Sequence, residues 1–288
     1  MPVQTTIEIA LAEAIARSAA SAPPQLASAL QYATFPGGGR VRPRLCMAVA
    51  SACGDDAPEL STAVAVAIEL LHCASLVHDD LPCFDDAEER RGKPSLHRAY
   101  GAPLAVLVGD ALIVLSFETL ARAASAAPHR LAPLVTLLAQ SAGAPHGLVA
   151  GQAWESEPNP PFDRYQQAKT GALFTAATMA GAIAAGRPPE PWRAVGEALG
   201  QAYQVADDLL DALAGASESG KSMMRDAALG RPNAVTALGV DGAVERLRSL
   251  SAAAISALPE CPGAESLRIL VRELAERLVP AALKQSAA

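Results

Sequence analysis

Two clusters of aspartates, each set in an apolar stretch with helical periodicity, constrain this chain most. The first is Asp79-Asp80-Leu81-Pro82-Cys83-Phe84-Asp85-Asp86, and the second is Asp207-Asp208-Leu209-Leu210-Asp211. Burying so many carboxylates is too costly unless cations neutralise them. Ligands that are all oxygen favour Mg²⁺, which completes its shell with water and substrate phosphates. The sequence therefore predicts a metal and diphosphate site between two helices.

The periodicity of the whole chain indicates an all-α fold. Apolar residues recur at i, i+3, i+4 and i+7, and 51% of the residues are hydrophobic but only 4% aromatic, as in a helical core of small side chains. No break is long or polar enough to be an interdomain linker, so residues 1–288 are expected to form a single domain. We expect helices at 4–20, 24–33, 41–53, 57–81, 103–126, 129–143, 146–156, 162–186, 189–214, 231–238, 240–257 and 263–282.

Charge and cysteine content exclude several classes of protein. The net charge of −7 and the lack of a basic stripe with interleaved aromatics argue against nucleic acid as a partner. The segment Met1–Ala20 has no basic region followed by an apolar core, and no uncharged apolar run is long enough to span a bilayer. Five cysteines without a CxxC pair fit free thiols in a reducing compartment. We expect a cytoplasmic protein without an integral membrane segment.

The spacing within each cluster predicts its geometry. Asp207 and Asp211 are four residues apart, so they lie on one face of a helix and can hold metal ions together. Pro82 prevents the first helix from continuing, which places Asp79 on its last turn and Asp85 on a turned segment that follows. Either cluster alone could be a solvated helix end, but two of them, each after an apolar run, oppose that interpretation.

Cations accompany both clusters. Arg90 and Arg91 follow the first cluster, Lys221 follows the second, and Arg42 and Lys169 lie elsewhere in the chain. Guanidinium groups bind phosphate oxygens bidentately, whereas lysine contributes a mobile point charge. Each of these residues alone would be interpreted as an ordinary surface cation. Together with Mg²⁺ they could neutralise two diphosphates.

These motifs resemble those of the trans-prenyl diphosphate synthases, from about Pro36 to Val235. Within that family the pattern is most similar to the bacterial geranylgeranyl diphosphate synthases that feed carotenoid and bacteriochlorophyll synthesis in purple bacteria. The motifs are the two aspartate clusters, His72, Gln204, Gly37-Gly38-Gly39-Arg40-Val41-Arg42-Pro43, Arg90-Arg91-Gly92, Gly151-Gln152-Ala153-Trp154-Glu155, Lys169-Thr170-Gly171, Gly220-Lys221 and Arg231-Pro232-Asn233-Ala234-Val235.

The resemblance implies an isoprenoid-synthase-type helical bundle around a deep central cavity, working as a homodimer. It also implies a reaction in which isopentenyl diphosphate is condensed with an allylic diphosphate, expected to be farnesyl diphosphate. The products would be all-trans geranylgeranyl diphosphate and inorganic diphosphate. Three Mg²⁺ ions would be bound in each active site.

The same resemblance implies a role for individual residues. The metal ions would be held from one side by Asp79, Asp80 and Asp85, and from the other by Asp207, Asp208 and Asp211. The allylic diphosphate would be bound by Arg90, Lys169 and Lys221. The diphosphate of isopentenyl diphosphate would be bound by Arg42, His72 and Arg91. The Thr170 carbonyl and Gln204 would face the developing carbocation.

Product length is expected to depend on the helix that carries the first cluster. In the family, a bulky aromatic residue at the fifth position before the first aspartate goes with a fifteen-carbon product. This chain has Ala74 at that position, followed by Ser75, so a twenty-carbon product is favoured. Leu71, one turn further down, is a candidate for the floor of the cavity, and another helix is the alternative source of that floor.

Two departures from the family pattern leave alternatives open. Gly39 stands where most members carry a lysine for isopentenyl diphosphate, so either Arg40 or Arg44 compensates or the affinity is lower. The segment 222–226 is also bulkier than usual, and Arg225 or Arg231 could take a cationic role there. A catalytically silent partner subunit and a Mg²⁺-dependent terpene cyclase are the alternative functions. Two intact clusters oppose the first, and a second diphosphate site opposes the second.

Overall fold

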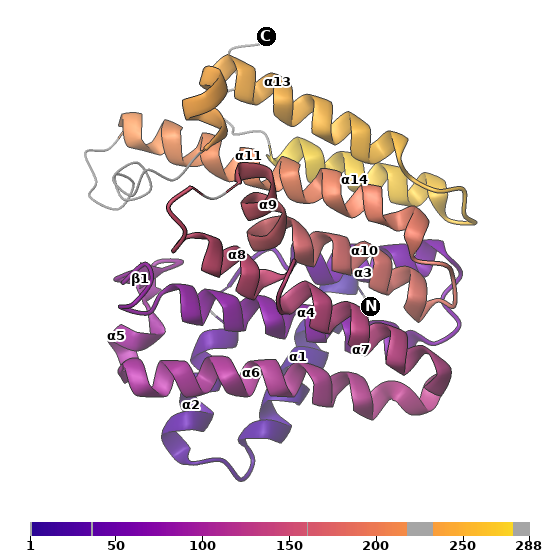
Figure 1. Cartoon of the computed structure of the whole chain (residues 1–288). Coiled ribbons are helices and arrows are strands. Elements are labelled where there is room, and N and C mark those ends of the chain that lie inside the picture. The colour runs from indigo at the N-terminus through magenta and orange to yellow at the C-terminus, as the bar shows by residue number, and fades with distance from the viewer. Residues whose placement is uncertain (1, 36, 160, 218–232, 279–288) are drawn as a thin grey trace.

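The structure is a computed structural model, and it describes residues 2–35, 37–159, 161–217 and 233–278 (Figure 1). These residues form the predicted all-α fold, with a single two-stranded hairpin as the only sheet among them. The helices are α1 (Val3–Ala19), α2 (Pro24–Thr34), α3 (Val41–Ala52), α4 (Pro58–Asp79), α5 (Leu96–Tyr100), α6 (Ala102–Ala123), α7 (Pro128–Ala142), α8 (Leu148–Trp154), α9 (Phe162–Gln166), α10 (Ala172–Ala184), α11 (Arg193–Ser217), α13 (Ala234–Ser256) and α14 (Ala264–Leu278).

Helix α4 lies near the middle of the bundle and positions the first aspartate cluster (Figure 1). Pro58 in its first turn suits a position where no backbone donor is needed. Its apolar side chains, among them Leu60, Ile68 and Leu71, are buried against α3, α6 and α10. The helix ends at Asp79, and this confirms the prediction that Pro82 stops it. The apolar packing of α4 thus fixes where the acids begin.

Helix α11, which carries the second cluster, belongs to another layer of the bundle together with α13 and α14 (Figure 1). Its apolar face, which includes Ala202, Val205 and Leu209, packs against Ala243 and Leu247 of α13. On its other side α11 packs against α10, whose thirteen residues are all buried. The predicted helix boundary between 238 and 240 appears as a kink in α13 at Gly239, where φ is 71°.

The predicted helix at 162–186 is interrupted. The structure has α9, then a π-helix, η2 (Gln167–Gly171), and then α10. A π-turn inserts one residue per turn without changing the apolar pattern on either side, so periodicity does not reveal it. Short 3₁₀ turns, η1 (Ala124–Ala126) and η3 (Glu190–Trp192), flank α6 and α11.

Three short elements after the first cluster, two strands and a helix, were not predicted. Strands β1 (Glu89–Arg90) and β2 (Lys93–Pro94) pair antiparallel, and helix α5 follows. Each is shorter than the window over which a hydrophobic period can be recognised. The turn between the strands places Arg91 (φ 56°) and Gly92 (φ 73°) in the left-handed region.

Two helices are long and apolar enough to cross a membrane by length and composition alone. They are α4 and α6, and 78% of the apolar window of α4 but only 44% of that of α6 is buried within the protein. Helix α6 exposes Val106, Leu107 and Val114. An apolar helix of this kind that is half exposed offers a surface for a partner.

Candidate active site

A cavity of about 740 Å³ opens between the two layers of helices. Asp79 from α4 and Asp207 from α11 both line it, so the two clusters face a common space, as the sequence predicts. Its apolar wall comes from several helices and includes Leu71, Ala74, Ile113, Ala142, Leu148 and Leu173. The cavity therefore combines carboxylates with an apolar interior that excludes water from bound ligand.

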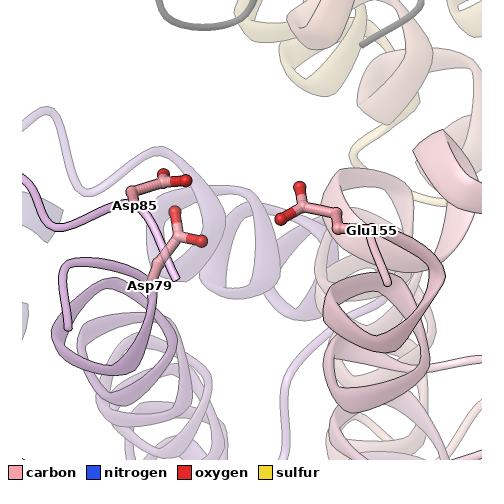
Figure 2. Close-up of side chains that lie close together, drawn as sticks. All are labelled: Asp79, Asp85 and Glu155. Atoms are coloured by element: carbon pink, nitrogen blue, oxygen red, sulfur yellow. The ribbon is translucent and has the colours of Figure 1, made fainter. Parts of the chain in front are cut away.

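The first cluster is assembled by a turn that returns towards the end of α4. The backbone N–H of Asp85 donates to the carbonyl oxygen of Asp79 at 3.0 Å, which brings the two acids together. Glu155, the residue after α8, faces them from another helix (Figure 2). One carboxylate oxygen of each of these three residues lies within 4.8 Å of the others. Three converging carboxylates form a set of oxygen donors that fits a divalent cation.

Asp80, adjacent to Asp79, has a different partner. Its Oδ1 accepts a hydrogen bond from Arg90 Nε at 3.0 Å, and its side chain is only 4% exposed. Burial raises the pKa of Asp80, and the hydrogen bond and charge of Arg90 oppose that rise. Asp80 thus holds Arg90 at the edge of the cavity, which the Arg90 side chain lines.

Lys169, in the π-helix, lies between two acids of the first cluster. Its Nζ is 3.2 Å from Asp79 Oδ1 and 2.5 Å from Glu155 Oε1. The hydroxyl of Tyr165 also donates to Glu155 Oε1, at 2.7 Å. Burial raises the pKa of Asp79, Lys169 opposes the rise, and Asp85 adds to it. The lysine ammonium supplies positive charge to the first cluster.

In the second cluster the adjacent aspartates also differ. Asp207 faces the cavity, whereas Asp208 Oδ2 accepts from the backbone N–H of Ala234 at 2.7 Å, where α13 begins. Asp208 Oδ1 accepts from Gln204 Nε2 at 2.9 Å. Burial raises the pKa of Asp207 to about 7; Arg42 opposes the rise, and Asp211 and Asp208 add to it. Asp211 is exposed one turn further along α11.

Thr170 and Gln204, predicted to face a carbocation, are in contact. The Thr170 hydroxyl donates to Gln204 Oε1 at 2.6 Å, and Thr170 lines the cavity. Lys221 and the segment 222–226, together with Arg231, lie outside the described residues.

The three residues predicted to hold a second diphosphate lie together at the cavity. Arg42, His72 and Arg91 all line it, and Arg42 Nη1 is 3.4 Å from His72 Nε2. The Arg42 guanidinium stacks on the rings of Phe174 and Tyr203, with centroid distances of 4.6 and 5.5 Å. Its Nε is buried and has no hydrogen-bond partner in the part of the chain that the structure describes. Burial strongly lowers the pKa of His72, and Arg42 and Arg91 add to the effect, so the imidazole is neutral.

The suggestion that Arg40 compensates for the glycine at position 39 is wrong. The side chain of Arg40 is 1% exposed and forms ion pairs with Glu8 at 2.8 Å and Glu69 at 2.6 Å. Arg40 therefore links α1 to α4 through these two ion pairs. Arg44 lines a separate, smaller apolar cavity.

Sequence reasoning missed Glu155 as a member of the acidic site. It ends the segment Gly151-Gln152-Ala153-Trp154-Glu155, and an acid directly after a short apolar helix was the available signal. Its approach to Asp79 and Asp85 depends on the packing of α8 against η2, which no local pattern encodes.

Comparison with known proteins agrees with this geometry. The sequence profile described as polyprenyl synthetase matches residues 23–261. The chain belongs to the polyprenyl synthetase family.

Two relatives match along nearly the whole chain. A geranylgeranyl diphosphate synthase from Cereibacter sphaeroides is 57% identical over 98% of this chain and 98% of its own length. A geranylgeranyl diphosphate synthase from Rhodobacter capsulatus is 51% identical over 97% of each chain.

Solved structures share the fold. An FPP/GFPP synthase from Zymomonas mobilis, solved in the apo state, superposes with a TM-score of 0.79 at 33% identity, covering 95% of this chain and 98% of that one. A geranyltransferase from Helicobacter pylori, complexed with magnesium and isoprenyl diphosphate, superposes with a TM-score of 0.76 at 27% identity, covering 96% and 98%.

Proposed function

We propose that this protein condenses isopentenyl diphosphate with an allylic diphosphate, expected to be farnesyl diphosphate. The products are all-trans geranylgeranyl diphosphate and inorganic diphosphate. The observation that carries this proposal is that Asp79 and Asp207, from two aspartate clusters on different helices, face one cavity with an apolar interior. The two relatives that match along nearly the whole chain are both geranylgeranyl diphosphate synthases, which supports this product.

The donor atoms of the site fit magnesium. Asp79, Asp85 and Glu155 offer three clustered oxygens, and Asp207 faces them across the cavity. Burial raises the pKa of both Asp79 and Asp207, and a bound cation would favour their charged forms. We assign the metal contacts to these residues and Asp211, with three Mg²⁺ ions in the complete site. When bound, Mg²⁺ stabilises the negative charge of the leaving diphosphate as a Lewis acid.

The structure supports a different role for two aspartates that the family resemblance placed among the ligands. Asp80 is engaged by Arg90, and Asp208 by Gln204 and the start of α13. We assign both to holding neighbouring groups in place. Each cluster then contributes the first member of its Asp-Asp pair to the metal site.

The cations divide between two diphosphates. Lys169 and Arg90 lie beside Asp79 and are placed to hold the allylic diphosphate, a role to which we add Lys221 from the family resemblance. Arg42 and Arg91, with neutral His72, are placed to bind the diphosphate of isopentenyl diphosphate. The buried Arg42 Nε has no hydrogen-bond partner among the residues that the structure describes, and a diphosphate oxygen is an acceptor of the right kind.

The chemistry requires positioning more than proton transfer by side chains. The allylic C–O bond breaks, the diphosphate leaves with the electron pair, and the double bond of isopentenyl diphosphate attacks the allylic cation. A proton is then lost to the departing diphosphate. From the family resemblance we assign the Thr170 carbonyl and Gln204 to stabilisation of the cation. Thr170 lines the cavity and its hydroxyl donates to Gln204, and the apolar wall keeps water from the cation.

Product length follows from the depth of the cavity beneath Asp79. Ala74 and Ser75 line it, Leu71 lies one turn deeper, and Ile113 of α6 contributes to the same wall. The floor therefore comes from more than one helix. Replacing Ala74 by tyrosine should fill the cavity and shorten the product towards C15, whereas Ala74→Ser should still give C20. An unchanged C20 product from Ala74→Tyr would contradict this assignment.

We further propose that the chain is a single cytoplasmic domain that pairs as a homodimer through the exposed apolar face of α6. Leu107 and Val114 are 55% and 66% exposed on that face. A second copy would cover apolar area that is costly to leave in water. Sedimentation should show a dimer that Val114→Glu dissociates and that Arg122→Glu, at the far end of α6, does not.

One assay tests the proposed reaction. Purified protein is incubated with Mg²⁺, isopentenyl diphosphate and each of dimethylallyl, geranyl and farnesyl diphosphate, and the products are sized after dephosphorylation. The proposal predicts a C20 alcohol and no product when Mg²⁺ is chelated. A cyclic hydrocarbon would indicate a terpene cyclase. Turnover that requires a second, added protein would indicate a silent partner subunit.

A further inference from the structure

The glycine loop at 37–39 contacts the side chain of Arg91, which lies on the turn of the β1–β2 hairpin. The Arg91 guanidinium donates a hydrogen bond to the carbonyl oxygen of Gly37. A Cβ atom added at Gly38 would stand 2.5 Å from Arg91 Nη1 and 2.9 Å from its Cζ. Carbon cannot approach these atoms so closely, so Arg91 occupies its position only because residue 38 has no side chain.

The three glycines differ in this respect. A Cβ at Gly37 would meet nothing within 4 Å, and one at Gly39 would meet only Val41 Cγ2 at 3.4 Å. Both Gly37 (φ 92°) and Gly38 (φ 134°) have positive φ. A substitution at Gly37 or at Gly38 would therefore strain the backbone. Of the three glycines, only Gly38 would bring a Cβ atom into a clash with Arg91.

Arg91 is the cation that the hairpin brings to this loop. Arg40, next in sequence to the glycines, is buried against Glu8 and Glu69 and is not among the residues that line the cavity. Arg91 lines the cavity together with Arg42 and His72; burial lowers the pKa of both of these groups, and the charge of Arg91 adds to the effect. Two guanidinium groups and a neutral imidazole that share one region favour an anion between them.

We propose that Gly38 is a positioning residue for isopentenyl diphosphate, because its lack of a side chain leaves the space in which the Arg91 guanidinium lies. This inference rests on the proposed function, in which Arg91 binds that diphosphate. Arg91 and Gly92 form the turn of the hairpin, both with positive φ, and the hydrogen bond from Arg91 to Gly37 links this turn to the glycine loop.

The test compares Gly38→Ala with Gly37→Ala, which shares its loop and its positive φ but adds no clash. Displacing one charged hydrogen-bond donor should raise the KM for isopentenyl diphosphate about tenfold in Gly38→Ala. The increase should be at least about threefold larger than in Gly37→Ala, and kcat and the KM for the allylic substrate should change less than about twofold. Equal increases in the two variants would overturn the proposal.

Two further variants separate positioning from general damage. In an Arg91→Gln background, Gly38→Ala should raise this KM no further, and an undiminished increase would overturn the proposal. If Gly38→Ala does not fold, Arg91→Lys provides the test. It keeps the charge but loses the planar group docked on Gly38, so the KM for isopentenyl diphosphate should rise severalfold, and an unchanged KM would overturn the proposal.

A binding measurement tests the role of Gly38 even if the proposed reaction is wrong. If the parent protein does not condense the two substrates, the same variants are compared by calorimetric titration with inorganic diphosphate. The expected order of affinity is parent, then Gly37→Ala, then Gly38→Ala. Equal affinity of the two alanine variants would overturn the role of Gly38 irrespective of the reaction.

Discussion

The two aspartate clusters look alike in sequence but are built differently. In the first, a turn brings Asp85 back to Asp79, and Lys169 already contacts the carboxylate of Asp79. In the second, the acids follow one another along a regular helix, and burial raises the pKa of Asp207 to about 7. A lysine therefore contacts the cavity-facing aspartate of the first cluster, whereas in the second cluster burial raises the pKa of Asp207 and Arg42 opposes the rise.

The comparison also shows what the clusters share. In each Asp-Asp pair the first residue, Asp79 or Asp207, faces the cavity. The second residue, Asp80 or Asp208, is buried with a structural partner. Adjacent residues on a helix point about 100° apart, so only one of the two can face a given cavity.

The largest expected effect is a difference in kcat between substitutions of Asp79 and Asp80, the first Asp-Asp pair. Asp79→Asn should lower kcat about a thousandfold, because a charge that faces the reacting diphosphate is lost. Asp80→Asn should lower kcat only about tenfold, through displacement of Arg90, and should cost about 1–3 kcal/mol of unfolding free energy. Steady-state kinetics measures kcat, and urea denaturation measures the free energy of unfolding. Equal losses of kcat in the two variants would contradict the different roles assigned to Asp79 and Asp80.

In the second pair, substitutions of Asp207 and Asp208 should also differ in their effect on kcat, but by a smaller factor than in the first pair. Asp207→Asn should lower kcat about a hundredfold with little change in stability. Asp208→Asn should instead destabilise the protein by about 1 kcal/mol, because Asp208 caps the start of α13 through the backbone N–H of Ala234. Thermal melting together with kinetics checks this, and a stable, inactive Asp208→Asn would place Asp208 in the metal site.

Much of this arrangement follows from sequence, for identifiable reasons. Apolar periodicity located the long helices, and Pro82 located the end of α4. The partners of Asp80 and Asp208 could not be predicted, because Arg90 and Ala234 reach them through turns and packing rather than through local spacing. Glu155 and the π-helix that carries Lys169 were missed for the same reason.

Burial raises the pKa of Asp207 to about 7, and this predicts that Mg²⁺ binding depends on pH near neutrality. The folded pKa of Asp207, about 7, lies above the ordinary 3.8, so metal-free protein retains a proton there below pH 7 and loses stability as the pH rises through 7. Mg²⁺ must displace that proton, so its affinity should fall up to about tenfold per pH unit below pH 7. Calorimetric Mg²⁺ titrations from pH 8 to pH 6 measure this. Asp207→Asn should flatten the dependence, and an unchanged slope in that variant would assign the proton elsewhere.

The smallest expected effect concerns Lys169. Since its ammonium lies against Asp79 and Glu155, it competes with Mg²⁺ in the absence of substrate. Lys169→Met should therefore bind Mg²⁺ severalfold more tightly than the parent, although it turns over more slowly. Tyr165→Phe, which removes a neutral donor to Glu155, is the matched control and should shift Mg²⁺ affinity less. Weaker Mg²⁺ binding by Lys169→Met would show that the lysine supports the metal site directly.

The central claim is that the two clusters hold one metal–diphosphate group between them, each through the first residue of its pair. A crystal structure of the protein with Mg²⁺ and inorganic diphosphate tests it directly. The account predicts metal ions that contact Asp79 and Asp85 on one side of the diphosphate and Asp207 on the other, with Asp80 still bound to Arg90 and Asp208 to Ala234. Metal ions bound to Asp80 and Asp208, or none at all beside Asp207, would contradict it.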